Sequence, residues 1–343
     1  MLSELDLALV NALQINPRAP WSLIGETLGV SAVTAARRWA RLVANGDAWM
    51  TAYPGGDLAA RMVLAFVEID CSPGCLRQVS DTVAADEHAA SVDYISGRRD
   101  LFVHVVATTL TEVSDYVVHR LAVLPGVAGI RTLISPRIFS EGSRWQVRAI
   151  SQAQRAALST RSPQQAPATA FDELNRALIL ALGADARASY AELAELLDVS
   201  ASTVRRRLDA LLATGALRLR CEVARSLSPS PVSMTLWLRV PPDRLEAATA
   251  SLTTLPQVRM CAAVSGPANL LLIVWLRTQT DTVELESALV TRLPWLEIVD
   301  RAVILRQVKL MGRVLDGAGR ESGRVPLDFW SPVRPRTAGA PAR

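Results

Sequence analysis

The sequence is poor in the side chains that most often perform chemistry. Its 343 residues include four cysteines and three histidines, and neither set has the spacing of a metal site. The histidines, His88, His104 and His119, all lie in the first half of the chain. A glycine-rich phosphate loop and a nucleophile elbow are also missing. We therefore expect a protein that is not an enzyme, without metal or cofactor, whose reduced cysteines serve packing.

Long hydrophobic runs are absent as well. The longest aliphatic run, Leu270–Leu276, is too short to cross a bilayer and suits a buried strand. The N-terminus has no basic region followed by an apolar stretch, so we expect no signal peptide, no membrane partner and a cytoplasmic location. The net charge is +4, yet residues 1–50 contain four arginines and four acids, so the overall charge says little about partners.

Most of the sequence consists of two similar copies. Segments return at a constant offset of 169 residues, without gaps. The matching pairs include 2–13 with 171–182, Leu28–Ser31 with Leu197–Ser200, Arg37–Arg38 with Arg206–Arg207, and Ser96–Gly97 with Ser265–Gly266. A repeat this long indicates duplication of a whole multi-domain unit rather than a solenoid. Each copy, of about 140 residues, is large enough to bury its own core.

The start of each copy predicts three helices. The first has a leucine stripe at every fourth residue, and the second is expected at 21–28 and at 190–197. The third helix starts after a serine suited to cap it and stops at a glycine in both copies, from Ser31 to Gly46 and from Ser200 to Gly215. Two helices joined by so short a turn form a helix-turn-helix. We therefore predict DNA-binding domains at 1–53 and 171–223.

The remainder of each copy, 61–140 and 231–310, has the pattern of alternating strands and helices. Its elements follow the order β-α-β-β-α-β, which is typical of a ferredoxin-like domain. The fold class is therefore α+β, with two copies of a winged or three-helix helix-turn-helix domain plus a ferredoxin-like domain. The segment 141–170 is predicted to be a linker with a short helix at 152–158, and 331–343 a disordered tail.

The third helix has the residues expected of a DNA-reading surface. If Ala35, Trp39 and Leu42 are buried, short polar and arginine side chains lie on the opposite face. Such side chains reach base edges and phosphates in a major groove. The predicted DNA-binding residues are Val33, Thr34, Arg37, Arg38 and Arg41 in the first copy, and Ser202, Thr203, Arg205, Arg206 and Arg207 in the second. The alternative is a solvated, arginine-rich helix face.

Together the helix-turn-helix, its arginine-rich third helix, the Ser-Gly hairpin and Leu124-Pro-Gly-Val127 resemble the Lrp/AsnC family of bacterial transcription factors, over roughly 2–140 and 171–310. The resemblance implies a DNA-binding domain, followed by a ligand-sensing RAM domain that dimerises and assembles further. Its effector loop corresponds to Gly97, Asp100, Gly266 and Asn269. The family often has Gly-Asp-x-Asp there, and both copies lack the first acid. The alternative is that these glycines only serve hairpins that need a positive φ.

The favoured interpretation is a transcriptional regulator that binds double-stranded DNA, responds to an amino acid or another small molecule, and forms homo-oligomers. Because the two reading faces differ, we expect an operator with unlike half-sites. Two alternatives remain open at this point. The same fold, as the resemblance implies, is used by sirohaem decarboxylases, and a RAM-like sensor could act on protein partners without DNA.

Overall fold

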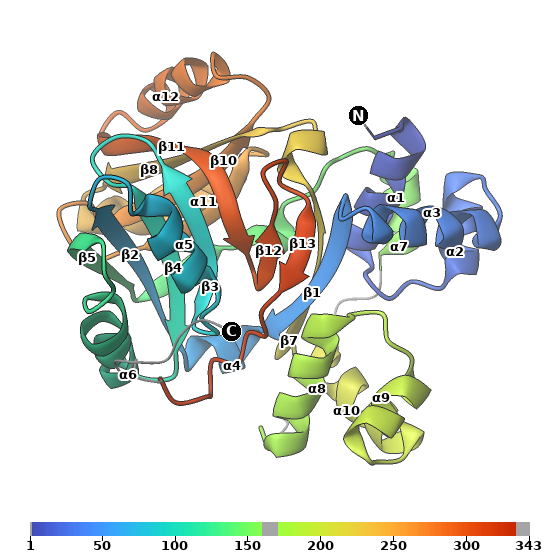
Figure 1. Cartoon of the computed structure of the whole chain (residues 1–343). Coiled ribbons are helices and arrows are strands. Elements are labelled where there is room, and N and C mark those ends of the chain that lie inside the picture. Colours follow the sequence, from blue (N-terminus) through green and yellow to red (C-terminus); the bar gives the residue numbers. More distant parts are fainter. Residues whose placement is uncertain (1, 160–170, 334–343) are drawn as a thin grey trace.

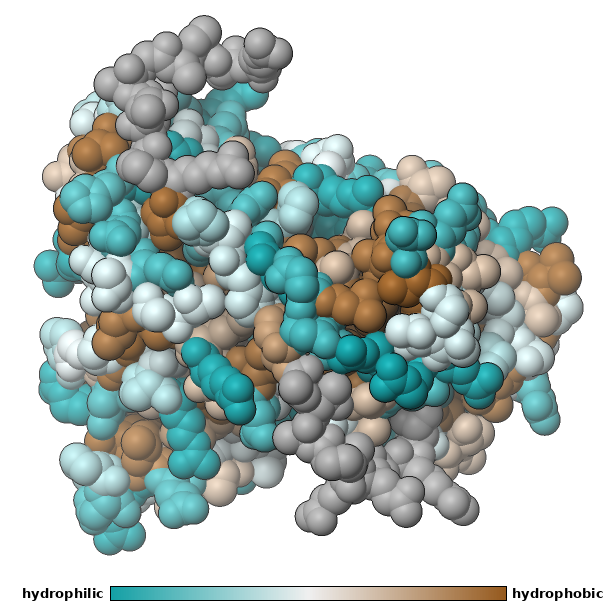
Figure 2. Space-filling view, turned by 90° about the horizontal axis from the view of Figure 1, so that it is seen from below, coloured by the Kyte–Doolittle hydropathy of each residue, from teal (hydrophilic) through white to brown (hydrophobic). Residues whose placement is uncertain are grey.

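The structure of the protein, a computed structural model, describes residues 2–159 and 171–333. Two small helical domains lie beside a larger body of strands and helices (Figure 1). The predicted α+β fold class is confirmed, since both helix-turn-helix units and both β-α-β-β-α-β units form. On the face shown in Figure 2, hydrophilic residues are interspersed with smaller apolar patches.

Each helix-turn-helix domain has three helices. They are α1 (Glu4–Ile15), α2 (Trp21–Leu28) and α3 (Ala32–Ala44) in the first copy, and α8 (Glu173–Ala184), α9 (Tyr190–Leu197) and α10 (Ala201–Ala213) in the second. Ser31 and Ser200 cap the third helices, because each hydroxyl accepts from the backbone three residues later. The predicted buried stripe of Ala35, Trp39 and Leu42 is confirmed, and the equivalent residues Val204, Leu208 and Leu211 are buried in the second copy.

A two-stranded ribbon joins the two helical domains. Strand β1 (Ala48–Pro54) pairs antiparallel with β7 (Leu217–Val223). Ala48 lies opposite Val223 and Pro54 opposite Leu217, so the same positions of the two copies exchange places. The ribbon therefore lies on a pseudo-two-fold axis, as an isologous dimer interface would.

The two ferredoxin-like units follow the predicted order. The first consists of β2 (Val63–Cys71), α5 (Leu76–Ala84), β3 (Ala89–Ile95), β4 (Leu101–Ala107), α6 (Leu110–Asp115) with a π-helical continuation to Leu121, and β5 (Val127–Ser135), after a short α4 (Gly56–Ala60). The second consists of β8 (Val232–Arg239), α11 (Leu245–Leu252), β9 (Val258–Ala263), β10 (Leu270–Leu276), α12 (Asp281–Arg292) and β11 (Glu297–Leu310).

The strands of both units form one sheet that closes on itself. Its order is β5-β2-β4-β3-β11-β8-β10-β9-β6, and β6 (Arg137–Ser140) directly follows β5 in the chain. Strand β11 pairs first with β8 and then with β3, so it belongs to both units. Phe66, Phe102 and Trp237 pack together inside, and the helices cover the outside. The predicted boundary at 140 therefore ends a strand that already belongs to the other unit.

The segments after each last strand are more ordered than the sequence predicted. Within the predicted linker, a 3-10 turn (Gly142–Arg144) lies against Arg220 of β7 and Arg259 of β9, and α7 (Gln152–Leu158) packs on the first helical domain. Residues 160–170 lie outside the described residues. After β11, a hairpin of β12 (Arg313–Leu315) and β13 (Glu321–Arg324) was not predicted. Of the predicted disordered tail, 331–333 are described and Ser331 donates to Glu87 at 2.8 Å; 334–343 lie outside the described part.

Candidate nucleic-acid interface

The outer face of α3 is open at the first turn. Val33 is 74% exposed, and Arg37 is exposed one turn further along the same face. Thr34 is half-buried, and its amide donates to the cap hydroxyl of Ser31 at 3.0 Å. These three predicted residues therefore lie where a recognition helix would enter a groove.

Two other predicted residues of α3 bind within the protein. Arg38 and Arg41 form ion pairs of 3.0 and 3.1 Å with Asp6, which is 4% exposed in α1. Burial opposes ionisation of Asp6, but hydrogen bonds from Ser3 and Arg38 and the two arginine charges outweigh it, so its pKa is lowered. Arg38, with its side chain 31% exposed, thus ties α3 to α1, whereas Arg41 remains 54% exposed.

The second copy uses the same positions with different partners. Arg207, the equivalent of Arg38, pairs with Asp172 at 2.8 Å. Arg205 pairs with Asp209 one turn further along α10 at 3.7 Å. Ser202 is exposed, and the Thr203 amide donates to the Ser200 cap at 3.2 Å. Two of the three consecutive arginines are thus engaged within the domain.

Arg37 and Arg206 differ from their neighbours. Both are exposed, and neither forms an ion pair within 2–159 and 171–333. They occupy equivalent positions in the two copies, at the offset of 169. Within the described residues, the structure therefore separates the predicted arginines into those that form ion pairs and one arginine on each recognition helix that forms none.

A reciprocal arginine clamp, which sequence reasoning missed, holds the two helical domains together. Arg18 reaches from the first domain to the second, and Arg187 reaches back. Arg18 donates to the carbonyls of Ala186 and Ala188 at 2.7 and 2.9 Å, and Arg187 donates to those of Pro17 and Ala19 at the same distances. Since 18 and 187 are equivalent positions, the repeat itself was the signal that could have found it.

Aromatic rings complete this reciprocal clamp. The Arg187 guanidinium lies 4.0 Å from the ring centre of Trp21, and that of Arg18 lies 5.5 Å from Tyr190, the equivalent residue. Cation–π contacts of this kind are strongest when the cation is shielded from water. Burial, together with the nearby charge of Arg18, lowers the pKa of Arg187. The relative position of the two domains is therefore set by bidentate contacts to fixed backbone.

The predicted effector residues make structural contacts. Asp100 accepts the amide of Cys71 at 2.7 Å, and Asn269 makes two hydrogen bonds with the backbone of Val240, the equivalent position. Gly97 and Gly266 have φ of +94° and +112°, as their hairpins require. These contacts explain the residue types without a ligand. An effector role for the four residues stays a prediction.

The three histidines differ in burial and in the residues that surround them. His104 is half-buried and lies edge-on against Phe66 and Phe102, with ring centres 4.9 and 5.3 Å away. Burial and the charge of Arg220 lower its pKa to about 4, so the imidazole is neutral. His88 is buried beside a tyrosine, and His119 is exposed, 3.9 Å from Asp115.

Within the described ranges, no group of three or more histidine, cysteine or acidic side chains is arranged to hold a metal ion. Over the same ranges, none of the helices has the length and apolar character needed to cross a membrane.

Comparison with known proteins matches these domains individually. The model of the AsnC-type helix-turn-helix domain matches residues 2–43 and again 171–212. The model of the Lrp/AsnC ligand binding domain matches residues 64–145. The chain belongs to the Lrp/AsnC family. Its domain order, helix-turn-helix followed by the ligand-binding fold, is present twice.

The proteins similar to this Lrp/AsnC protein include shorter ones and one of double length. Uncharacterized HTH-type transcriptional regulators of Pyrococcus abyssi and Pyrococcus horikoshii are 27% and 26% identical over 134 residues, which is 39% of this chain and 85% of theirs. The solved siroheme decarboxylase NirDL, in complex with an iron-uroporphyrin III analogue, is 16% identical with a TM-score of 0.58. That match covers 90% of this chain and 93% of NirDL, so the double-length fold is shared.

Proposed function

We propose that this Lrp/AsnC protein is a sequence-specific regulator of transcription that binds double-stranded DNA with both helix-turn-helix domains. The observation that carries the proposal is that Arg37 and Arg206 are equivalent, exposed and without an ion pair in the described part of the chain. We further propose that the protein acts in the cytoplasm, responds to a small molecule and forms homo-oligomers. The family of its domains supports these finer statements.

The recognition helices suit major-groove reading. Short side chains at the helix start, Thr34 in α3 and Ser202 and Thr203 in α10, reach base edges, while each free arginine forks onto guanine or contacts phosphate. Arg38 and Arg207 act indirectly in this proposal, because they hold the helices in place. The reciprocal clamp of Arg18 and Arg187 keeps the two helices at one separation, so binding by one domain positions the other.

Fluorescence anisotropy with duplex DNA from the chain's own upstream region tests this function. Arg37→Ala combined with Arg206→Ala should weaken binding by about 1–3 kcal/mol for each arginine that contacts a base. The control is Arg77→Ala, which removes one exposed arginine outside the helical domains. Binding should also fall steeply with added salt. Unchanged affinity in the double variant would remove the assignment of the reading face.

Catalysis is the second candidate, favoured by the likeness to NirDL over most of the chain. We propose that this chain is not a decarboxylase, because its histidines do not converge and His104 packs edge-on against two phenylalanine rings. Incubation of the purified protein with sirohaem tests it: we expect neither a tetrapyrrole absorption shift nor release of carbon dioxide. An absorption shift or release of carbon dioxide would instead support catalysis. A sensor that acts without DNA would show no salt-dependent binding to any duplex.

A further inference from the structure

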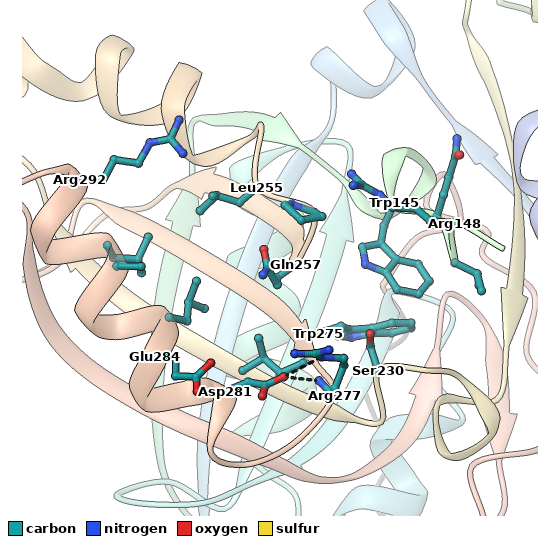
Figure 3. A pocket seen from close by; sticks show the side chains of 17 residues that line it. Trp145, Arg148, Ser230, Leu255, Gln257, Trp275, Arg277, Asp281, Glu284 and Arg292 are labelled. Carbon is teal, nitrogen blue, oxygen red and sulfur yellow. Dashed lines mark hydrogen bonds and ion pairs between the residues drawn. The ribbon is translucent and has the colours of Figure 1, made fainter. Parts of the chain in front are cut away.

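A cavity of about 440 Å³ opens beside the second ligand-binding-type unit (Figure 3). Residues 145–148 of the connector form one wall, and one face of α12 forms the other. The loop before β9 and the end of β10 complete the lining. The volume lies within the range of about 300–1,000 Å³ that small-molecule sites occupy.

Two indoles form the apolar end of the cavity. The rings of Trp145 and Trp275 meet edge to face with their centres 4.7 Å apart, and both residues are buried. Arg259 lies over the Trp275 ring at 4.2 Å and donates to the carbonyl of Gly142, so the indoles are held from behind. This end of the cavity is rigid and suited to a flat apolar group.

The polar groups of the cavity are left open. The side-chain oxygens of Gln146 and Gln257 are buried and have no hydrogen-bond partner in the described part of the chain. In Figure 3, Gln257 lies between the indoles and α12. Arg277 pairs with Asp281, whereas Glu284 and Arg148 form no ion pair within the described ranges. The site therefore offers acceptors for an amine and a cation for an anion.

In the first copy, the region equivalent to this cavity is filled by side chains of the protein itself. The equivalents of Arg259 and Trp275 there are Ala90 and Val106, and the C-terminal segment covers them. Leu327 and Phe329 pack onto this surface, and both are buried. In one copy the chain thus supplies its own leucine and phenylalanine, and in the other the corresponding place is an open cavity.

We propose that this cavity binds a small molecule with an apolar, preferably aromatic, body that carries both an amine and a carboxylate. The indoles cover the body, Gln257 and Glu284 accept hydrogen bonds from the amine, and Arg148 or Arg292 pairs with the carboxylate. The site is separate from the loops of Asp100 and Asn269, whose polar groups already bind backbone.

The connector links this cavity to one DNA-binding domain. The Val147 amide, within the cavity wall, donates to Gln14, and the Ala149 amide, directly after the wall, donates to Asn11; both distances are 2.8 Å and both acceptors lie in α1. A ligand that contacts Trp145 and Arg148 can therefore shift the connector and, through these hydrogen bonds, α1 of the first helical domain. This part of the inference rests on the proposed DNA-binding function: occupancy changes the affinity of α3 for its half-site.

Isothermal titration calorimetry of the full chain, without DNA, tests the site. The probes are L-phenylalanine and L-leucine, compared with phenylethylamine and 3-phenylpropionate, which each lack one charged group. We expect one amino acid bound per chain, and affinities about tenfold lower or worse for the two analogues. Ala288→Trp, which fills the cavity from the exposed face of α12, should abolish binding. Glu284→Gln should weaken it.

The first copy provides matched controls. His119→Trp and Asp115→Asn change the positions equivalent to Ala288 and Glu284 and should leave binding intact. No binding of either amino acid, binding that survives Ala288→Trp, or equal loss in His119→Trp would overturn the site. If L-phenylalanine binds but the protein binds no DNA, the proposed function fails and the site stands. Binding that leaves DNA affinity unchanged would overturn the link through the connector.

Discussion

The two sides of the closed sheet were built from one plan and now differ in chemistry. Where β6 meets β9, a buried ion cluster forms: Glu222 contacts both Arg220 and Arg259, and Tyr53 donates to Glu141 at 2.6 Å. On the other side, where β11 meets β3, the equivalents of Arg220, Arg259 and Glu141 are Thr51, Ala90 and Leu310. One side has buried charges that pair with each other and carries a cavity, whereas the other has Ala90 and Leu310 at the corresponding positions and is covered by the C-terminal segment.

This difference shows what fusing two copies permits. In a symmetric homodimer every substitution appears on both sides of the axis, so a buried charge cluster would have to form twice. Within a single chain, one junction can gain an ion cluster while the equivalent positions of the other hold uncharged residues. The recognition helices diverge in the same way, with Val33 opposite Ser202. The constant offset of 169 residues shows that the two copies keep the same fold, while the residues at equivalent positions have changed independently.

Breaking the ion cluster should give the largest effect. Glu222→Ala leaves two buried guanidinium groups without their shared carboxylate, which costs about 3–5 kcal/mol in the free energy of unfolding. Tyr53→Phe changes the equivalent position of the other copy and removes only one hydrogen bond, so it should cost about 1.5–3 kcal/mol. Denaturant unfolding measures both. If Glu222→Ala left the free energy of unfolding unchanged, the claim that this junction depends on a buried ion cluster would be contradicted.

Making the first helical domain resemble the second sharpens the comparison. Asp6→Asn introduces the residue found at position 175 and removes the ion pairs with Arg38 and Arg41. We expect a loss of about 1–3 kcal/mol. Because its folded pKa is lowered, Asp6 stabilises the native state above its unfolded pKa and loses this effect as pH falls through the folded value. Below that pH, urea melts of the variant and parent should coincide.

The effect expected at the only lysine of the sequence appears as a dependence of stability on pH. Lys309 is fully buried in β11 and donates to the Asp86 carbonyl at 2.7 Å; its equivalent is Ser140. Burial lowers its pKa to about 7. The unfolded chain therefore binds more protons between about pH 7 and 10, so stability rises with pH there. Lys309→Met should flatten this rise in thermal unfolding. An unchanged pH profile would show that the amine is not responsible.

Much of the scaffold could be predicted from sequence because local signals were repeated. Serine caps, glycine stops and apolar stripes define α2, α3 and their counterparts to within a few residues. The β-α-β-β-α-β order could also be predicted, because its pattern recurs in both copies. Closure of the sheet could not be predicted, because it depends on β11 and β5–β6 crossing between units that are far apart in sequence.

The candidate site was predicted less completely. Helical periodicity placed the arginines on one face, but it could not separate Arg37 from Arg38, since the difference is an acid 32 residues earlier. The contacts of Arg18 and Arg187 with carbonyls depend on docking of the two domains. The cavity beside Trp275 needs the connector, which composition alone described as a linker.

The central claim is that one chain reads two unlike half-sites with two recognition helices. Selection of bound duplexes from a random library, repeated with Arg37→Ala and with Arg206→Ala, tests this claim most directly. We expect a non-palindromic operator, in which each substitution relaxes the sequence preference of a different half by about 1–3 kcal/mol. A perfect inverted repeat, or both substitutions relaxing the same half, would contradict it.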